Sequence, residues 1–112
     1  MSDQLPTDIL VTAQIRIAAN NGIPIFVRHR GDNNSGTIVL KINKLDGSAR
    51  VLTQVMQDEK LVWAPVSKKD PMPDEDAENY LKQRVDFDPD VWLLEVEDKE
   101  GRHWFPGKVI TY

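Results

Sequence analysis

Four short segments rich in β-branched and aliphatic residues, each ended by turn-forming residues, constrain the fold of this chain more than any other feature. They cover residues 24–29, 37–43, 50–56 and 61–66, and Gly, Asn and Asp are frequent in the stretches between them. Parallel neighbours need a long crossover, and these connections are short, so consecutive segments are expected to pair antiparallel. The sequence therefore predicts a β-meander over its middle part.

Two helices are expected to flank these strands. The first covers residues 9–20, with Thr7 and Asp8 able to cap its start and Gly22 as the left-handed stop behind it. The second begins at Pro73, is acidic in its first turn and ends before Pro89. A last strand over residues 91–97 then turns through 98–101 into a hairpin partner at 102–105. We predict an α+β fold, with a mainly antiparallel, five- to six-stranded sheet and both helices packed on one face.

The first helix carries two apolar stripes, although a helix packed on one sheet needs only one. The first stripe consists of Ile9, Leu10, Ala13 and Ile17. The second stripe consists of Val11, Ile15, Ala18 and Ala19. Either a loop of the same chain covers the second stripe, or that stripe is a subunit interface. The latter alternative predicts a homodimer.

Composition and charge restrict the class of protein. With 112 residues, 40% of them hydrophobic and 29% charged, the chain suits a single globular domain over residues 1–112. It contains no cysteine, which excludes disulfides and thiolate metal sites. The net charge of −4 disfavours nucleic acid as a partner. The start resembles no signal peptide and no apolar run is long enough to span a membrane, so we expect a cytoplasmic protein that does not bind membranes.

Known catalytic and metal-binding signatures fail on spacing. The glycines form no dinucleotide or phosphate-loop pattern, and neither histidine has a second histidine at ligand spacing. Residues 32–36 resemble the start of a calcium loop, but the glycine arrives one residue early. Pro89-Asp90 and Glu97-x-Lys99 match the residue pattern of a metal-dependent nuclease, in which both carboxylates bind one metal ion. Here Asp90 and Glu97 would lie roughly 23 Å apart along one strand, too far to share a metal. No cofactor and no metal are therefore expected.

Two charge clusters remain as candidates for a site. The basic cluster lies at the end of the first strand, where Arg28 and Arg30 precede a loop whose amides could hold an anion. The acidic cluster lies around the last strand, where Glu95 and Glu97 share one face about 7 Å apart and could divide acid and base roles. We predict that the clusters are neighbours and that an arginine of the first pairs with a carboxylate of the second. The expected pairs join Arg28 or Arg30 to Asp88, Asp90 or Glu95.

Two stretches of the sequence are similar to a known family. The first spans residues 28–36 and continues to Leu45-Asp46-Gly47; the second spans residues 84–103 and contains the block Phe-Asp-Pro-Asp-x-Trp…Glu-x-Glu-Asp, its most specific part. Together they resemble the short bacterial proteins catalogued as domain of unknown function 1491, found mainly in alphaproteobacteria. That family usually reads Arg-Arg-Gly-Asp where this chain has Arg28-His29-Arg30-Gly31-Asp32. The resemblance implies a stand-alone bacterial domain and no particular activity.

Three functions stay open at this point. The favoured interpretation is a non-enzymatic protein-binding or adaptor module that self-associates. The alternatives are a binder of small anionic ligands that uses the loop from Arg28 to Gly36, and a hydrolase that uses Asp90, Glu95 and Glu97. The candidate binding residues are Arg28, Arg30, Gly31, Asp32, Gly36, Asp88, Asp90, Trp92, Glu95, Glu97, Asp98 and Arg102.

Overall fold

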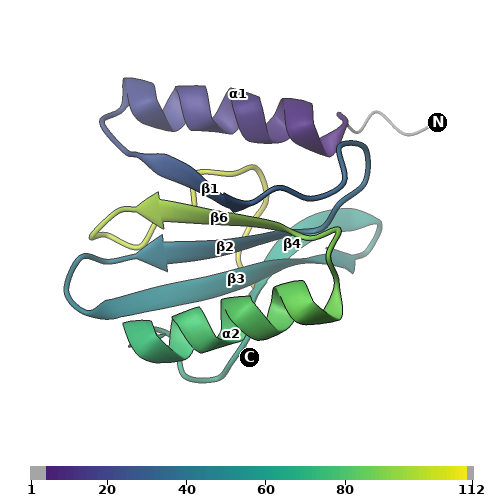
Figure 1. Cartoon of the computed structure of the whole chain (residues 1–112). Helices are drawn as coiled ribbons and strands as arrows, with labels where there is room; N and C mark the ends of the chain where they lie inside the picture. The colour runs from purple at the N-terminus through teal and green to yellow at the C-terminus, as the bar shows by residue number, and fades with distance from the viewer. Residues whose placement is uncertain (1–4, 111–112) are drawn as a thin grey trace.

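A computed structural model describes residues 5–110 of the chain. Its elements, in chain order, are α1 (Thr7–Asn20), β1 (Ile25–His29), β2 (Ile38–Asn43), β3 (Ser48–Gln57), β4 (Lys60–Pro65), β5 (Met72–Pro73), α2 (Asp74–Phe87) and β6 (Trp92–Glu97) (Figure 1). The strands form a six-stranded sheet in the order β1-β6-β2-β3-β4, with β5 paired to β3. The α+β class and the mainly antiparallel sheet are confirmed. No helix in the described part is long and apolar enough to cross a membrane.

The last strand, β6, lies in the middle of the sheet. It pairs parallel with β2 and antiparallel with β1, so β1 and β2 are not neighbours and the meander covers β2, β3 and β4 alone. Because both edges of β6 are occupied, residues 102–105 find no edge to pair with, and the expected hairpin is wrong. The chain instead crosses to β4, where the Trp63 amide donates to the Lys108 carbonyl and the Ile110 amide donates to the Trp63 carbonyl, both at 2.8 Å.

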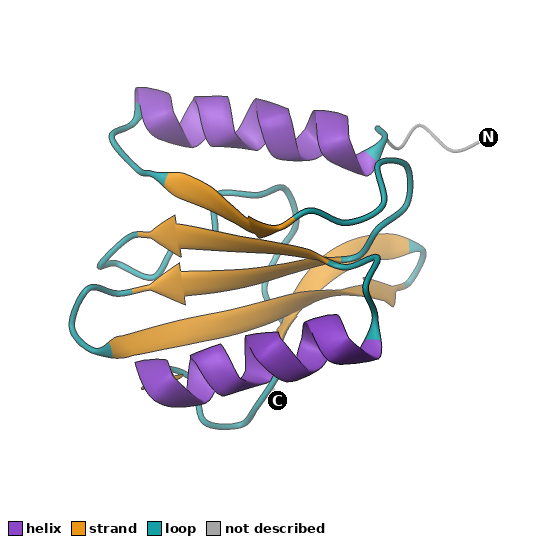
Figure 2. Ribbon diagram, in the orientation of Figure 1, coloured by secondary structure: helices purple, strands orange, loops and turns teal. Residues whose placement is uncertain are grey.

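The two helices pack on opposite faces of the sheet, which corrects the expectation that they share one face (Figure 2). Leu40 of β2 packs in the core that contains Val11 and Ala18 of α1. Its neighbour Val39 packs in the core that contains Leu81 of α2. Successive side chains of a strand point to opposite faces, so each helix covers its own side. The central strands β2 and β6 are accordingly buried on both faces for most of their length.

The second stripe of α1, which was expected to be covered by a loop or by another subunit, is the one that packs on the sheet. Val11 and Ala18 are buried in the core, and Ile15 packs partly against it. An interface between subunits through Val11, Ile15, Ala18 and Ala19 is therefore wrong, because this chain already covers most of that stripe. Two isoleucines of the other stripe are exposed instead, Ile9 by 51% and Ile17 by 48%. Both stripes contain similar side chains, so periodicity alone could not decide which one faces the sheet.

Candidate functional site

The basic and acidic clusters are neighbours, as predicted. Strand β1 pairs with β6, and a register shift between Val27 and His29 marks a bulge at Arg28. From this position Arg28 donates hydrogen bonds to Glu95 of β6 at 2.5 Å and to Glu78 of α2 at 2.6 Å. The expected pairing of Arg28 with Glu95 is thus confirmed, and Glu78 is a partner that the sequence did not indicate.

Lys41 completes this cluster from the middle of the sheet. Its side chain is 4% exposed, and its Nζ lies 2.5 Å from Glu78, 2.6 Å from Asp74 and 3.7 Å from Glu95. We call Arg28, Lys41, Asp74, Glu78 and Glu95 the interlayer network, because these residues join α2 to the sheet. A lysine inside the apolar run of β2 is the sequence signal that could have revealed it.

Within the interlayer network, Arg28 and Lys41 hold Glu78 in its ionised form. Hydrogen bonds from Arg28, and then from Lys41, lower the pKa of Glu78 to about 2. Burial alone would lower the pKa of Lys41, but its hydrogen bonds to Asp74 and Glu78 outweigh burial and raise it. Both carboxylate oxygens of Glu95 accept hydrogen bonds, one from Arg28 and the other from the side-chain Nδ2 of Asn43 at 3.0 Å. The arrangement suits a fixed connection between two layers better than proton transfer.

In the loop between β1 and β2, the carboxylate of Asp32 binds the main-chain amides that were expected to bind an external anion. Asp32 accepts hydrogen bonds from the amides of Asn34 at 3.1 Å and Ser35 at 2.9 Å. The bond from the Ser35 amide, followed by that from Asn34, lowers the pKa of Asp32. The Gly36 amide donates to the Asp32 carbonyl at 3.3 Å. Three amides of the expected anion site are therefore already bonded within the chain.

Gly31 and Gly36 serve the packing of this loop against β6. An added Cβ would lie 2.2 Å from the Asp90 carbonyl oxygen at Gly31 and 2.6 Å from it at Gly36. In the same place the buried Trp92 donates from its indole Nε1 to the Asp32 carbonyl at 2.7 Å, and the Asp32 amide donates to the Asp90 carbonyl at 3.0 Å. These residues therefore fasten the loop to the start of β6.

Arg30 adds a contact over the aromatic ring at this place. Its guanidinium carbon lies 5.0 Å from the centre of the Trp92 ring, within cation–π range. Because Trp92 is buried in the core, its indole is not a free recognition surface.

The carboxylates at the two ends of β6 have different surroundings. Asp98 is buried and accepts hydrogen bonds from Arg102 at 2.7 Å and from the Trp104 indole at 2.8 Å. Burial would raise the pKa of Asp98, but these bonds outweigh burial and lower it. Asp88 lies 3.5 Å from Arg84 and accepts from the Asp90 amide at 3.0 Å. These groups stabilise the turns into and out of the strand.

No cluster of ionisable side chains forms a metal centre in residues 5–110. No three His, Cys, Asp or Glu residues there are placed to hold a metal ion. Within the same residues, the carboxylates of Asp90 and Glu97 make no ion pair or hydrogen bond. The register places Lys41 opposite Glu95 and Asn43 opposite Glu97, so the two glutamates share one face of β6 as predicted.

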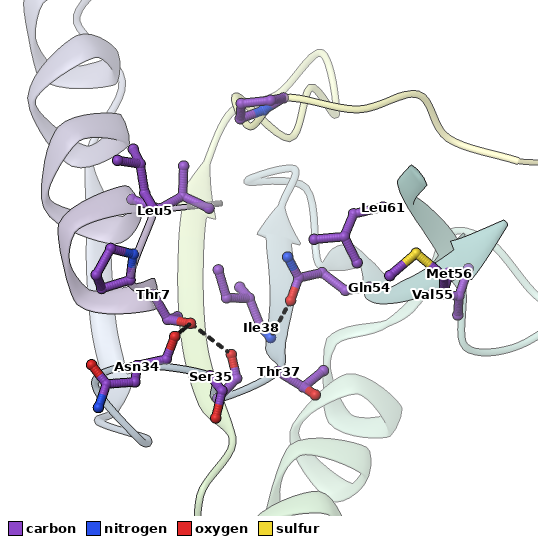
Figure 3. A pocket seen from close by; sticks show the side chains of 14 residues that line it. Leu5, Thr7, Asn34, Ser35, Thr37, Ile38, Gln54, Val55, Met56 and Leu61 are labelled. Carbon is purple, nitrogen blue, oxygen red and sulfur yellow. Dashed lines mark hydrogen bonds between the residues drawn. The ribbon is translucent and has the colours of Figure 1, made fainter. Parts of the chain in front are cut away.

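A groove that the sequence did not predict lies elsewhere, on the α1 side of the sheet. It has a volume of about 800 Å³ and opens between the start of α1, residues 34–38 and the hairpin of β3 and β4 (Figure 3). None of its lining residues is charged: they are Leu5, Pro6, Thr7, Leu10, Asn34, Ser35, Gly36, Thr37, Ile38, Gln54, Val55, Met56, Leu61 and Pro106. Sequence reasoning missed it because the walls come from distant stretches. Its one local signal is exposed Met56 and Leu61 beside a polar turn.

One wall of the groove is built by the start of α1. The Thr7 hydroxyl donates to the Gly36 carbonyl at 3.2 Å, and the Asp8 amide donates to the Asn33 carbonyl at 3.0 Å. The Asp8 contact, together with the Thr7 amide that donates to the Asn34 carbonyl at 3.3 Å, satisfies main-chain donors in the first turn of the helix that would otherwise need a capping side chain. These contacts replace the cap expected from Thr7 and Asp8, since Pro6 stands at the N-cap position and no side chain caps the helix.

The other wall is an incompletely paired strand. The β2–β3 ladder ends where Val39 faces Thr53, while β3 continues to Gln57 in its pairing with β4. At the end of the ladder, the Ile38 amide donates to the Gln54 side-chain oxygen at 2.8 Å (Figure 3). Gln57 and Lys60 flank the two-residue turn and form a hydrogen-bonded pair. Hydrogen-bonded and non-hydrogen-bonded pairs alternate along an antiparallel hairpin, so the next pair, Met56 with Leu61, is not hydrogen-bonded. The main-chain N–H and C=O groups of Met56 therefore point away from β4 and toward the groove. Beyond Gln54, β3 therefore presents an open edge on the groove side.

Known proteins with the same fold were found by sequence and by structure. A sequence profile described as a protein of unknown function, DUF1491, matches residues 5–106. The crystal structure of a DUF1491 family protein from Caulobacter crescentus CB15 has a TM-score of 0.85 and 29% identity, covering 96% of this chain and 100% of that one. An NMR structure of a DUF1491 family protein from the same bacterium has a TM-score of 0.83 and 29% identity, covering 98% of this chain and 100% of that one.

A more distant structure shows the fold alone. The solution structure of protein Atu0922 from A. tumefaciens has a TM-score of 0.75 and 20% identity, covering 90% of this chain and 92% of that one. No curated protein matches the chain in sequence. The profile match covers nearly the whole chain, and the chain therefore belongs to the DUF1491 family of proteins of unknown function.

Proposed function

We propose that this protein is a non-enzymatic binding module that holds an extended peptide in the apolar groove beside β3. The observation that carries the proposal is the open edge of β3 at Met56, which lies directly along the groove. An extended peptide can add to such an edge through main-chain hydrogen bonds while its alternate side chains enter a pocket. The site thus offers backbone pairing for affinity and an apolar cavity for specificity.

The chemistry of the groove indicates which peptide fits. Its floor and walls contain Leu10, Ile38 and Leu61, and it has no charged side chain. A peptide strand that continues the line of β2 would place every second side chain into this apolar space. We therefore expect a short extended segment with aliphatic or aromatic residues at alternate positions and without charges at those positions.

The other two functions considered have less structural support. A hydrolase would need carboxylates that converge on a cavity, yet Glu95 is held by Arg28 and Asn43 and the groove contains no acid or base. An anion binder would need free amides in the loop before β2, but Asp32 occupies those of Asn34 and Ser35. A binding module requires neither feature.

Amide chemical shifts of isotopically labelled protein test the proposal. The probes are two neutral hexapeptides of equal composition, one alternating leucine with serine and one with its leucines adjacent. We expect the alternating peptide to bind more tightly and to shift the amides of residues 54–57 and Leu61. Met56→Asp should weaken this binding, whereas Leu45→Asp, at a similarly exposed position outside the groove, should not. No shifts with either peptide at about 1 mM, or shifts that avoid the groove, would contradict the proposal.

A further inference from the structure

The side of α1 that faces away from the sheet is an unpartnered surface. We call it the outer face of α1; it consists of Asp8, Ile9, Thr12, Ala13, Arg16 and Ile17, which line a shallow hollow of about 480 Å³. Isoleucines lie at its two ends, both about half exposed. The small residues Thr12 and Ala13 lie between them. In Figure 1, α1 is the outermost element at the β1 end of the sheet.

We propose that a second copy of this chain docks on the outer face of α1, with the two helices antiparallel around a two-fold axis. Ala13 is midway between Ile9 and Ile17, and Thr12 is midway between Asp8 and Arg16. A two-fold axis near these midpoints brings Ile9 of each copy to Ile17 of the other. The same axis brings Asp8 of each copy to Arg16 of the other. One symmetry operation therefore satisfies both the apolar and the charged pairs.

Charge complementarity selects a second copy as the occupant. Neither Asp8 nor Arg16 makes an ion pair within residues 5–110, although each is part of the hollow. In an antiparallel pair both charges gain a partner of opposite sign, whereas a parallel pair would place like charges together. The opposed helix dipoles favour the same antiparallel arrangement.

The middle of the outer face allows the two helices to approach closely. The Thr12 hydroxyl donates to the Asp8 carbonyl of its own helix at 2.9 Å, so its donor is satisfied without water. Ala13 adds a single methyl group. The distance between packed helices depends on the side chains at the crossing point, and small residues there let the flanking isoleucines interlock.

The proposed interface is independent of the peptide groove. Within α1 the groove uses Thr7 and Leu10, and neither belongs to the outer face. One helix face per copy is at the small end of specific interfaces, so we expect a reversible dimer that dissociates on dilution. Peptide binding and dimer formation can therefore fail separately in experiments.

Sedimentation velocity of the full chain over a range of protein concentrations tests the proposal. We expect wild type to pass from monomer to dimer between about 1 µM and 1 mM, and Ile17→Asp to weaken the dimer at least about tenfold. Phe87→Asp, at an exposed position on α2, is the matched control and should leave the dimer unchanged. The single variants Asp8→Arg and Arg16→Asp should each weaken the dimer, and the double variant should restore it.

Three results would overturn the proposal. One is a wild-type protein that stays monomeric at about 1 mM. Another is a dimer that survives Ile17→Asp but is lost in Phe26→Asp, which would place the contact on the exposed edge of β1. A third is failure of the double charge variant to recover association while its circular dichroism and melting temperature match wild type. This last result would exclude the antiparallel pairing of Asp8 with Arg16.

Discussion

Replacing Lys41 with methionine tests whether the interlayer network stabilises the fold. Methionine keeps a long, flexible and apolar side chain in the space between α2 and the sheet, but it removes the ammonium group. The carboxylates of Asp74, Glu78 and Glu95 then lose the cation that lies within 4 Å of all three. Arg28 still pairs with Glu78 and Glu95, but it makes no ion pair with Asp74.

The expected loss follows from the burial of these groups. Removing one partner of a fully buried ion pair costs roughly 3–5 kcal/mol. Here the side chains of Asp74 and Glu78 are 45% and 38% exposed, so water screens much of the remaining repulsion. We expect a loss of about 2 kcal/mol in the free energy of unfolding at pH 7, equivalent to roughly 8 °C in melting temperature for a domain of this size.

The effect of the substitution should depend on pH in a defined direction. The pKa of Glu78 is about 2 in the folded protein, below its ordinary value of 4.5. A lowered carboxyl pKa contributes stability above pH 4.5, and this contribution is lost as the pH falls toward 2. Lys41 is one cause of the lowering, so the deficit of Lys41→Met should be complete above about pH 5 and should shrink toward pH 2.

Urea unfolding followed by tryptophan fluorescence at pH 7, 5 and 3 measures this deficit. Lys60→Met, at an exposed position of β4, is the control and should change the free energy of unfolding by less than about 0.5 kcal/mol. A deficit as small as that of the control would refute the stabilising role of Lys41. An equal deficit at pH 7 and pH 3 would refute the electrostatic explanation and indicate a packing defect instead.

Three further substitutions test other parts of the structure. Gly31→Ala places a methyl group 2.2 Å from the Asp90 carbonyl oxygen and should cost about 2–3 kcal/mol in urea titrations, so an unchanged midpoint would contradict the close approach. Asp98→Asn removes the charge that accepts three hydrogen bonds and should cost about 2 kcal/mol by thermal melting; a neutral effect would argue against its buried role. Burial and the charge of Arg50 lower the pKa of His103 below 6.5, so stability should decline as the pH falls below 6.5. His103→Gln should flatten that decline below pH 6.5, and an identical slope in the variant would count against the assignment.

The positions of both helices and of β1 to β4 and β6 could be predicted from the sequence, but not β5 or the order of the strands in the sheet. Turn residues mark the ends of β1, β2, β3 and β4, and each lies within a few residues of its expected range. The placement of β6 between β1 and β2 depends on contacts between distant parts of the chain, which local propensity does not report. The run Val91-Trp92-Leu93-Leu94 carried a signal, because a strand apolar on both faces is typical of the centre of a sheet covered on both sides.

The candidate site was predictable to a similar extent. One basic and one acidic cluster, far apart in the sequence, indicated an ion pair between them, and the pair of Arg28 with Glu95 is of this kind. The participation of Lys41 and Glu78 depends on α2 packing on the face opposite α1, whereas the expected arrangement placed both helices on one face. The groove depends on where the β2–β3 ladder ends, and a register is set by pairing partners that no single segment reveals.

The central position of β6 determines when the fold can close during synthesis. Strand β1 pairs with β6, and β6 also pairs with β2. Until residues 92–97 leave the ribosome, β1 therefore has no neighbour in the sheet, and the first helix has no complete surface to pack on. The hairpins of β2, β3 and β4 can form early because their contacts are local, whereas the join between the two ends of the chain comes last. A nascent chain that stops before β6 would leave unpaired edges on β1 and β2, so the sheet closes only once residues 92–97 have been made.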